Sequence, residues 1–171
     1  LPVIHTACSP EGSMFGFEPN FGCCTANFSQ AWPMFALSTF YYNDKRIISA
    51  VPVPSSVSTV FDGSAVKIKL DTDYPLKGRL EYTVTTDSPV RFEFAIRIPD
   101  GVSSVCVDGN IINVKDNIYV IDREWNGTEK IVVELDFDIK IMPWDNDMYS
   151  LQRGTLCFSV PIEYKEVRTQ R

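Results

Sequence analysis

The chain has 171 residues, enough for one domain of ordinary size, and 44% hydrophobic, 12% aromatic and 22% charged residues, as is typical of a globular protein with a core. The net charge of −6 argues against a nucleic-acid partner, because phosphate binding depends on clustered Lys and Arg, and leaves neutral partners such as sugars open. No apolar run approaches the roughly 18 residues that a membrane-spanning helix needs, so no membrane partner is predicted.

Residues 1–22 contain three prolines and three glycines without a sustained hydrophobic period, which predicts an irregular arm. The chain starts at Leu1 without a basic and then apolar signal segment, so we expect a processed product or an excised portion. Localisation cannot be inferred from this end.

Two adjacent cysteines, Cys23 and Cys24, stand directly before the segment with a helical period. Helix amino termini favour a thiolate over a thiol, so both sulfurs are candidates for chemistry. The alternative is that they are ordinary buried small side chains. His5 and Cys8 would complete a zinc-type ligand set, but the spacing from Cys8 to Cys23 fits no compact zinc motif, and a structural loop is the favoured interpretation.

Apolar residues recur at steps of three and four between positions 25 and 42, which predicts a helix. Pro33 should kink this helix or start a second one, because proline lacks the N–H that the helix interior needs. Asn43 begins the turn that should close the segment.

From residue 47 onward the period changes to two, which predicts about nine or ten short strands. Asp108-Gly109 is a type I′ hairpin signal, and residues 122–127 are predicted to be a loop. This pattern predicts a mainly β fold, an antiparallel, jelly-roll-like β-sandwich. We predict that its core contains the apolar members of the alternating runs: Val66, Ile68, Leu70, Leu80, Tyr82, Val84, Phe92, Phe94, Ile96, Ile131, Val133 and Leu135.

Five stretches together resemble, in this order, the carboxy-terminal part of glycoside hydrolase family 127, also described as DUF1680-type proteins. The stretches are Cys23-Cys-Thr-Ala-Asn27 with a Trp-Pro shortly after, Asp71-Thr-Asp-Tyr-Pro75, Phe94-Ala-Ile-Arg-Ile-Pro99, Tyr119-Val-Ile-Asp-Arg-Glu-Trp125 and Leu151-Gln-Arg-Gly154. The resemblance extends from about residue 17 to residue 160.

The resemblance implies a retaining β-L-arabinofuranosidase whose α/α barrel carries the active site and is followed by β-sandwich domains. It implies that Cys23 is the nucleophile and that Cys23 and Cys24 are zinc ligands. Zinc would lower the pKa of both thiols, and a thiolate can attack an anomeric carbon where a thiol cannot.

The chain departs from this family by lacking the residues that would build the barrel, including the other zinc ligands and the acid/base carboxylate. We therefore expect residues 1–44 to be a barrel remnant with one or two helices, 45–162 a sandwich domain and 163–171 a polar tail. The parent protein would act on a carbohydrate with zinc as cofactor, whereas this chain would be inactive alone, bind zinc weakly or not at all, and self-associate through its amino-terminal helix region.

A second hypothesis is a stand-alone β-sandwich that binds glycan or protein, with Trp32, Trp125 and Trp144 as candidate stacking platforms. A third, a small cysteine or zinc site with redox function, is disfavoured because the sequence lacks the Cys-x-x-Cys motifs of such sites. Asp145 and Asp147 lie in a segment rich in turn residues, and we interpret them as a solvated turn rather than as a glycosidase acid/base pair.

Overall fold

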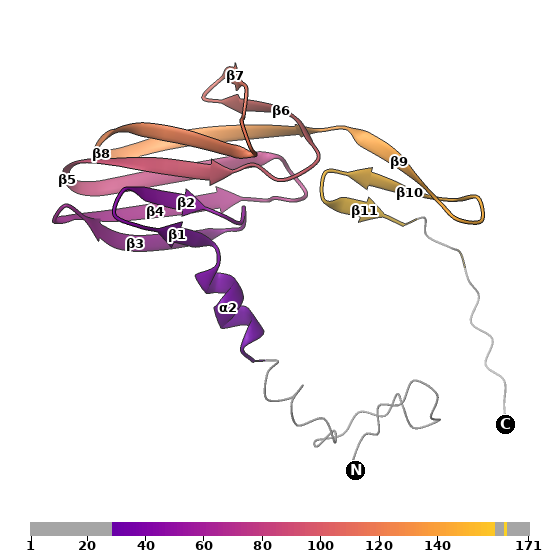
Figure 1. Ribbon diagram of the computed structural model, residues 1–171, viewed down its shortest axis with the longest axis horizontal. Coiled ribbons are helices and arrows are strands. Elements are labelled where there is room, and N and C mark those ends of the chain that lie inside the picture. Colours follow the sequence, from indigo (N-terminus) through magenta and orange to yellow (C-terminus); the bar gives the residue numbers. More distant parts are fainter. Residues whose placement is uncertain (1–28, 160–162, 164–171) are drawn as a thin grey trace, which may run out of the picture. The chain divides into compact units, whose positions relative to one another are not determined.

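The computed structural model describes residues 29–159 and residue 163, and divides the chain into two compact units, Leu1–Thr39 and Phe40–Arg171 (Figure 1). In the first unit the described residues form helix α2 (Ala31–Leu37). Pro33 lies in its first turn, where the missing N–H leaves no hydrogen bond unmade. No described helix is long and apolar enough to cross a membrane.

The expected helix over residues 25–42 is wrong at its carboxyl end. The side chains of Ser38 and Thr39 donate hydrogen bonds to the carbonyls of Met34 and Ala36, both at 2.8 Å, and thereby cap the last helical turn. Residues 40–42 then form a strand, because pairing with the following strand and burial of Phe40 outweigh the local helical period.

The second unit consists of eleven strands: β1 (Phe40–Tyr42), β2 (Arg46–Ser49), β3 (Ser55–Phe61), β4 (Ser64–Thr72), β5 (Arg79–Arg97), β6 (Val102–Val107), β7 (Asn110–Ile112), β8 (Ile118–Phe137), β9 (Ile139–Trp144), β10 (Met148–Arg153) and β11 (Leu156–Phe158). Eight of them form one sheet in the order β1-β2-β5-β8-β6-β7, with β4 also paired to β5 and β3 to β4. The last three form a separate sheet in the order β11-β10-β9. The mainly β, sandwich-like fold is thus confirmed.

Strands β5 and β8 pair along almost their whole length, with a register irregularity between Thr86 and Val90. Tyr82 and Phe94 lie on the same strand β5, yet their ring centroids are only 5.2 Å apart. Twelve residues of straight strand would separate them by about 40 Å, so the long strand pair bends back on itself. One continuous sheet therefore supplies both layers of the sandwich.

The predicted loop over residues 122–127 is wrong, because β8 runs through it without a break. Gly127, with a φ of 70°, pairs with Thr86 at one side of the irregularity, and Trp125 pairs with Val90 at the other. The turn-like composition of this segment marks the bend of a strand rather than a connection between strands.

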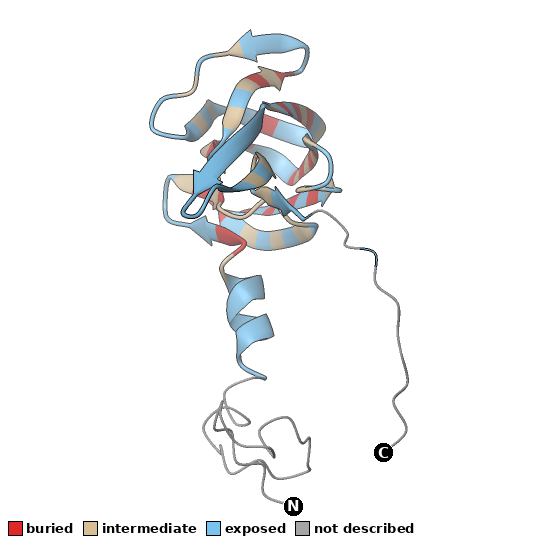
Figure 2. Cartoon of the chain, turned by 90° about the vertical axis from the view of Figure 1, so that its right-hand side faces the viewer, coloured by how far each residue is buried: buried red, intermediate tan, exposed pale blue. Residues whose placement is uncertain are grey.

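All twelve residues of the predicted core are buried, none with more than 3% of its surface exposed, as the red segments of Figure 2 illustrate. The Asp108-Gly109 hairpin is also confirmed, since both residues have positive φ values, 47° and 83°, and connect the paired residues Val107 and Asn110. Strand β2 runs parallel to β5, the one departure from antiparallel pairing within the described sheets.

Candidate functional site

The cysteines singled out from the sequence, Cys23 and Cys24, lie outside the described residues, as do His5 and Cys8. Within the described residues, no group of three or more His, Cys, Asp or Glu side chains could hold a metal ion. Cys106 and Cys157 are free thiols in this part of the chain. The nucleophile and the zinc ligands therefore remain predictions.

The segment Asp71-Thr-Asp-Tyr-Pro75 ends β4 and begins the turn to β5, and it contains a cis peptide bond between Tyr74 and Pro75. The Thr72 hydroxyl donates a hydrogen bond to the Arg79 carbonyl at 2.7 Å and accepts one from the Tyr74 amide at 2.9 Å. Lys77 forms an ion pair of 2.7 Å with Asp73, whose hydrogen bond and charge raise the pKa of Lys77. These contacts between residues of the turn and its flanking strand ends stabilise its conformation.

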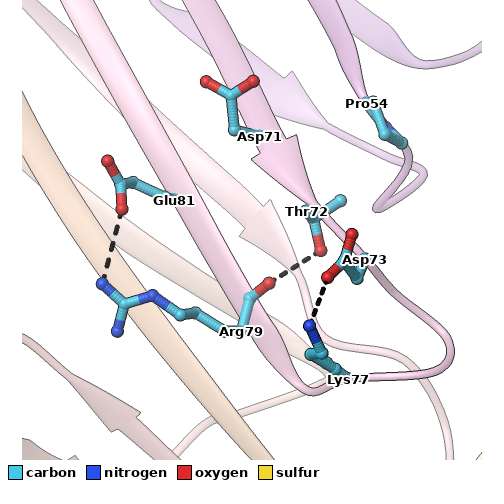
Figure 3. A pocket seen from close by; sticks show the side chains of 7 residues that line it. All are labelled: Pro54, Asp71, Thr72, Asp73, Lys77, Arg79 and Glu81. Atoms are coloured by element: carbon cyan, nitrogen blue, oxygen red, sulfur yellow. Dashed lines mark hydrogen bonds and ion pairs between the residues drawn. The ribbon is translucent and has the colours of Figure 1, made fainter.

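A hollow of about 370 Å³ lies beside this turn and is lined by charged side chains (Figure 3). Each of its three carboxylates has a cationic partner: Lys69 for Asp71, Lys77 for Asp73, and Arg79 for Glu81. Such a hollow can offer hydrogen bonds to a polar ligand.

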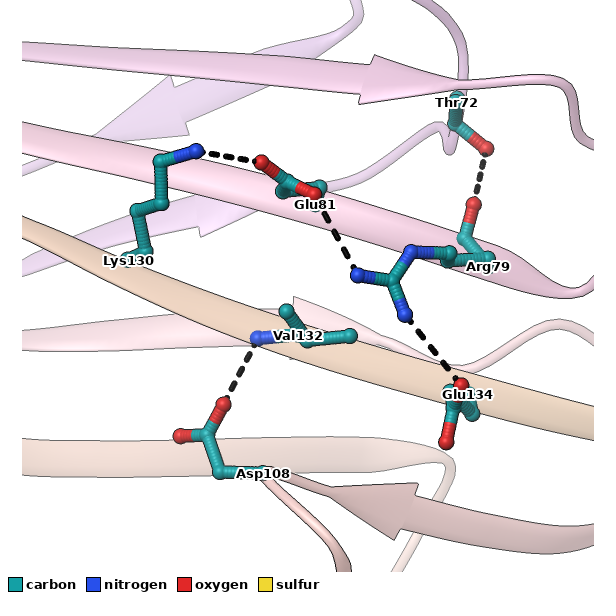
Figure 4. Close-up of polar contacts among 7 residues, drawn as sticks. All are labelled: Thr72, Arg79, Glu81, Asp108, Lys130, Val132 and Glu134. Carbon is teal, nitrogen blue, oxygen red and sulfur yellow. Dashed lines mark hydrogen bonds and ion pairs between the residues drawn. The ribbon is translucent and has the colours of Figure 1, made fainter.

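Glu81 is the best-connected carboxylate of this region (Figure 4). Lys130 lies 2.7 Å from it and Arg79 3.4 Å, and the Arg79 guanidinium also reaches Glu134 at 3.3 Å. The hydrogen bond and charge of Lys130, and then those of Arg79, lower the pKa of Glu81. A carboxyl group with a lowered pKa is ionised at neutral pH and cannot act as a general acid.

The segment Leu151-Gln-Arg-Gly154 attaches the small sheet to this same turn. The Tyr74 and Thr155 hydroxyls are 2.9 Å apart, and Arg153 donates to the Leu76 carbonyl at 3.4 Å. The Arg153 guanidinium also lies 5.3 Å from the centre of the Phe137 ring. Two stretches almost eighty residues apart in sequence thus meet at one junction.

Two glycines at this junction were not singled out from the sequence as contact sites. A Cβ on Gly154 would lie 2.5 Å from the Phe137 ring, and a Cβ on Gly78 would lie 1.9 Å from the Leu135 carbonyl oxygen. Only glycine allows these close approaches. Composition marks such positions only as turns, because the atoms they approach belong to distant segments.

Trp125 is not a stacking platform, contrary to the second hypothesis. Its side chain is fully buried, stacks on Phe92 at 5.4 Å between ring centroids, and donates its indole N–H to the Phe92 carbonyl at 3.1 Å. Trp144 is 59% exposed, and its indole N–H is bonded to the Ser150 hydroxyl at 2.9 Å. Asp145 and Asp147 lie in the exposed turn after Trp144, as predicted.

The second unit matches a family model. The model of the middle domain of GH127 β-L-arabinofuranosidases matches residues 47–137. No curated protein matches the chain.

Solved structures of similar fold include a GH127 β-L-arabinofuranosidase from Geobacillus stearothermophilus T6, with a TM-score of 0.68 and 20% identity over 87% of this chain and 26% of that one. A second GH127 β-arabinofuranosidase has a TM-score of 0.65 and 18% identity over 86% of this chain and 30% of that one. A protein described as a glycoside hydrolase has a TM-score of 0.65 and 17% identity over 87% of this chain and 28% of that one. The chain therefore spans less than a third of the length of each of these structures.

Proposed function

Because the chain belongs to the GH127 β-L-arabinofuranosidase family by the match of its residues 47–137, we propose that it is part of a glycoside hydrolase that acts on β-L-arabinofuranosides. The observation that carries this proposal is the agreement between the family match and the fold, since the described second unit resembles solved GH127 structures over most of this chain. The substrate class follows from the family alone.

In this proposal Cys23 is the nucleophile, and Cys23 and Cys24 are zinc ligands. Two adjacent thiols have the right donor chemistry for zinc but provide only half of a four-ligand set. When bound, zinc would lower the pKa of the thiols and keep the nucleophile in its thiolate form. Asn27 and Trp32, which belong to the same sequence motif, would follow the pair along the chain.

The second part of the proposal is that the 171-residue chain does not hydrolyse glycosides by itself. Retaining hydrolysis needs a group that protonates the leaving oxygen, worth on the order of 10²- to 10⁴-fold in rate, and a pocket that fixes the sugar. Among the described residues the most strongly connected carboxylate, Glu81, has a lowered pKa, which does not suit the acid role. The missing groups would come from other segments of a family enzyme.

The test is an assay of the chain on an aryl β-L-arabinofuranoside with zinc and a reductant, beside a Cys23→Ala variant. We expect no difference between the two. Turnover that depends on Cys23 would show that the active site is complete within these residues. Zinc binding measured by competition with a chromophoric chelator separates the metal question from activity, and a Cys24→Ala variant should weaken any binding that is found.

The alternative, a sandwich that binds glycan, is favoured by one observation: Trp144 lies on an exposed face of the small sheet beside Met142 and Met148, which are 38% and 57% exposed. Exposed aromatic rings stack on the apolar faces of sugars. Titration with arabinan oligosaccharides while tryptophan fluorescence is recorded tests this. A signal lost in Trp144→Phe would support binding there, and no signal in the parent chain would exclude it.

A further inference from the structure

A second hollow, of about 240 Å³, lies where the small sheet meets the larger one. Polar groups enter it from Tyr74 in the turn to β5, from Arg97 at the end of β5, and from Thr155 between β10 and β11. Pro52 and Pro99 contribute apolar ring carbons. The volume is below the roughly 300–1,000 Å³ of pockets for drug-sized ligands, so the hollow suits one small ring.

Arg97 is the one arginine among residues 29–159 without a partner. The others each bond a carboxylate or a backbone carbonyl: Arg46, Arg79, Arg91, Arg123 and Arg153. Arg97 has neither a hydrogen bond nor an ion pair within the described part of the chain, although it lines the hollow. A guanidinium carries five N–H donors in a fixed plane, and all of them are available to a ligand at this place.

Asp100 adds a negative charge to the same hollow. One of its oxygens accepts a hydrogen bond from the Asn117 side chain at 2.8 Å, and its other lone pairs remain free. A ligand that contacts both charged groups must accept hydrogen bonds from Arg97 and donate them to Asp100. Alcohol hydroxyls do both, whereas an anion would be repelled by Asp100 and by the net charge of −6.

Contacts around the hollow fix its polar groups before any ligand binds. The Tyr74 ring lies 6.2 Å from the Phe137 ring, and the Tyr74 hydroxyl lies 2.9 Å from that of Thr155. This hydroxyl pair retains one O–H donor and free lone pairs for a ligand. The Ile98 amide donates to the Asn117 carbonyl at 2.8 Å and holds the backbone at the end of β5. A pre-formed site loses less free energy to ordering when its ligand binds.

We propose that this hollow binds one residue of a neutral sugar. The sugar hydroxyls accept hydrogen bonds from Arg97 and donate them to Asp100, and the C–H groups of one ring face lie against Pro52 and Pro99. The sugar class follows from the lining of the hollow. The choice of arabinose among neutral sugars rests in addition on the proposed function.

The test is a titration of the ¹⁵N-labelled 171-residue chain with L-arabinose, followed by two-dimensional NMR. Free arabinose has no glycosidic bond to cleave, so the result does not depend on hydrolysis or on zinc. We expect saturable shifts of the Arg97, Asp100 and Thr155 amides. The dissociation constant should be on the order of 1–10 mM, as is typical of a ligand with about ten non-hydrogen atoms.

Arg97→Gln removes the charged donor and should weaken arabinose binding at least about tenfold. Arg91→Gln is the matched control, because Arg91 lies on the same strand, bonds Asp122 at 3.2 Å and does not line the hollow. Its affinity for arabinose should equal that of the parent chain. Unchanged amide shifts away from the hollow establish that each variant is folded.

Asp100→Asn distinguishes a sugar from an anion as the ligand. It replaces a charged acceptor by a weaker, neutral one, so arabinose should bind less tightly. An anion such as galacturonate would bind more tightly to this variant, because the repelling charge is gone.

The absence of saturable shifts would overturn the proposal, as would equal affinities of Arg97→Gln and the parent chain. Galacturonate or alanine that binds more tightly than arabinose would assign the hollow to charged ligands and also overturn it. Shifts confined to β9 and β10 would place the sugar on the small sheet near Trp144 instead. Binding of D-galactose here without binding of arabinose would support the sugar site and contradict only its link to the proposed function.

Discussion

The folded-over sheet and the small sheet contain similar alternating apolar residues, yet only the first buries them. On β8, Ile131, Val133 and Leu135 are at most 3% exposed, whereas on β9, which begins two residues after β8 ends, Ile139 and Ile141 are 71% and 65% exposed. The two sheets differ in whether a second layer of sheet covers their apolar face. Alternation produces a strand with one apolar face, but burial requires another sheet against that face, and the bend of β5 and β8 provides it only for the larger sheet.

Replacement of the two strand tryptophans should show this contrast most strongly. Trp125→Ala removes a fully buried ring that stacks on Phe92, and we expect the free energy of unfolding to fall by about 3–5 kcal/mol. Trp144→Ala, at an exposed position, should change it by less than about 1 kcal/mol. Urea unfolding monitored by circular dichroism measures both, and equal losses would mean that the small sheet is buried in solution.

Substitution of Gly154 tests the junction between the two regions. Gly154→Ala places a Cβ 2.5 Å from the Phe137 ring at a φ of 57°, so the free energy of unfolding should fall by about 1–3 kcal/mol. Gly109→Ala, with a φ of 83° and no atom within 4 Å, is the control for backbone strain alone and should cost about 1 kcal/mol. Faster hydrogen exchange in β10 of Gly154→Ala, with β5 unchanged, would assign the loss to the junction. An equal loss in both variants would contradict the collision with Phe137.

The buried tyrosine of the larger sheet should make stability depend on alkaline pH. Burial raises the pKa of Tyr82, and the hydrogen bond of Tyr82 with Ser49 at 2.9 Å offsets part of this rise. Above pH of about 10 the unfolded chain releases this proton while the folded chain keeps it, so stability falls by about 1.4 kcal/mol for each further pH unit until the folded pKa is reached.

Tyr82→Phe should remove that part of the pH dependence and, by leaving the buried Ser49 hydroxyl without this partner, lower stability at neutral pH by about 1–2 kcal/mol. Tyr149→Phe, on the exposed small sheet, is the control and should leave both quantities unchanged. Urea midpoints at several pH values measure the slope. The same slope with and without Tyr82 would contradict the assignment.

The smallest change in stability is expected from a substitution on the outer face of the larger sheet. Polar side chains on this face are in contact with solvent, as are those of the small sheet. Glu81→Gln removes the partner of Lys130 and Arg79, but solvent screens these ion pairs, so the urea midpoint should hardly move. A large loss at low salt that disappears at high salt would show that the network acts as a unit.

The sequence predicted the fold better than it predicted the residues that carry chemistry. Cys23 and Cys24 were singled out by their position before a helical period and by family resemblance, and no described residue tests them. Trp125 was a candidate binding platform under the second hypothesis and is buried instead, because composition cannot distinguish a buried ring from an exposed one. Tyr74 and Gly154 were singled out only as members of two separate motifs, and nothing local indicated that they meet at Phe137, since the three residues come from distant segments.

Local rules were sufficient for most of the strands, for the Asp108-Gly109 hairpin and for the twelve core residues, because the period of two and the demand for positive φ act over a few residues. Only the tertiary structure decided that residues 118–137 are one bent strand and that β2 runs parallel to β5. It also decided which of two equally apolar runs, on β8 and on β9, is covered. Each of these outcomes depends on backbone pairing and packing between residues far apart in the chain, and such contacts leave no trace in a local pattern.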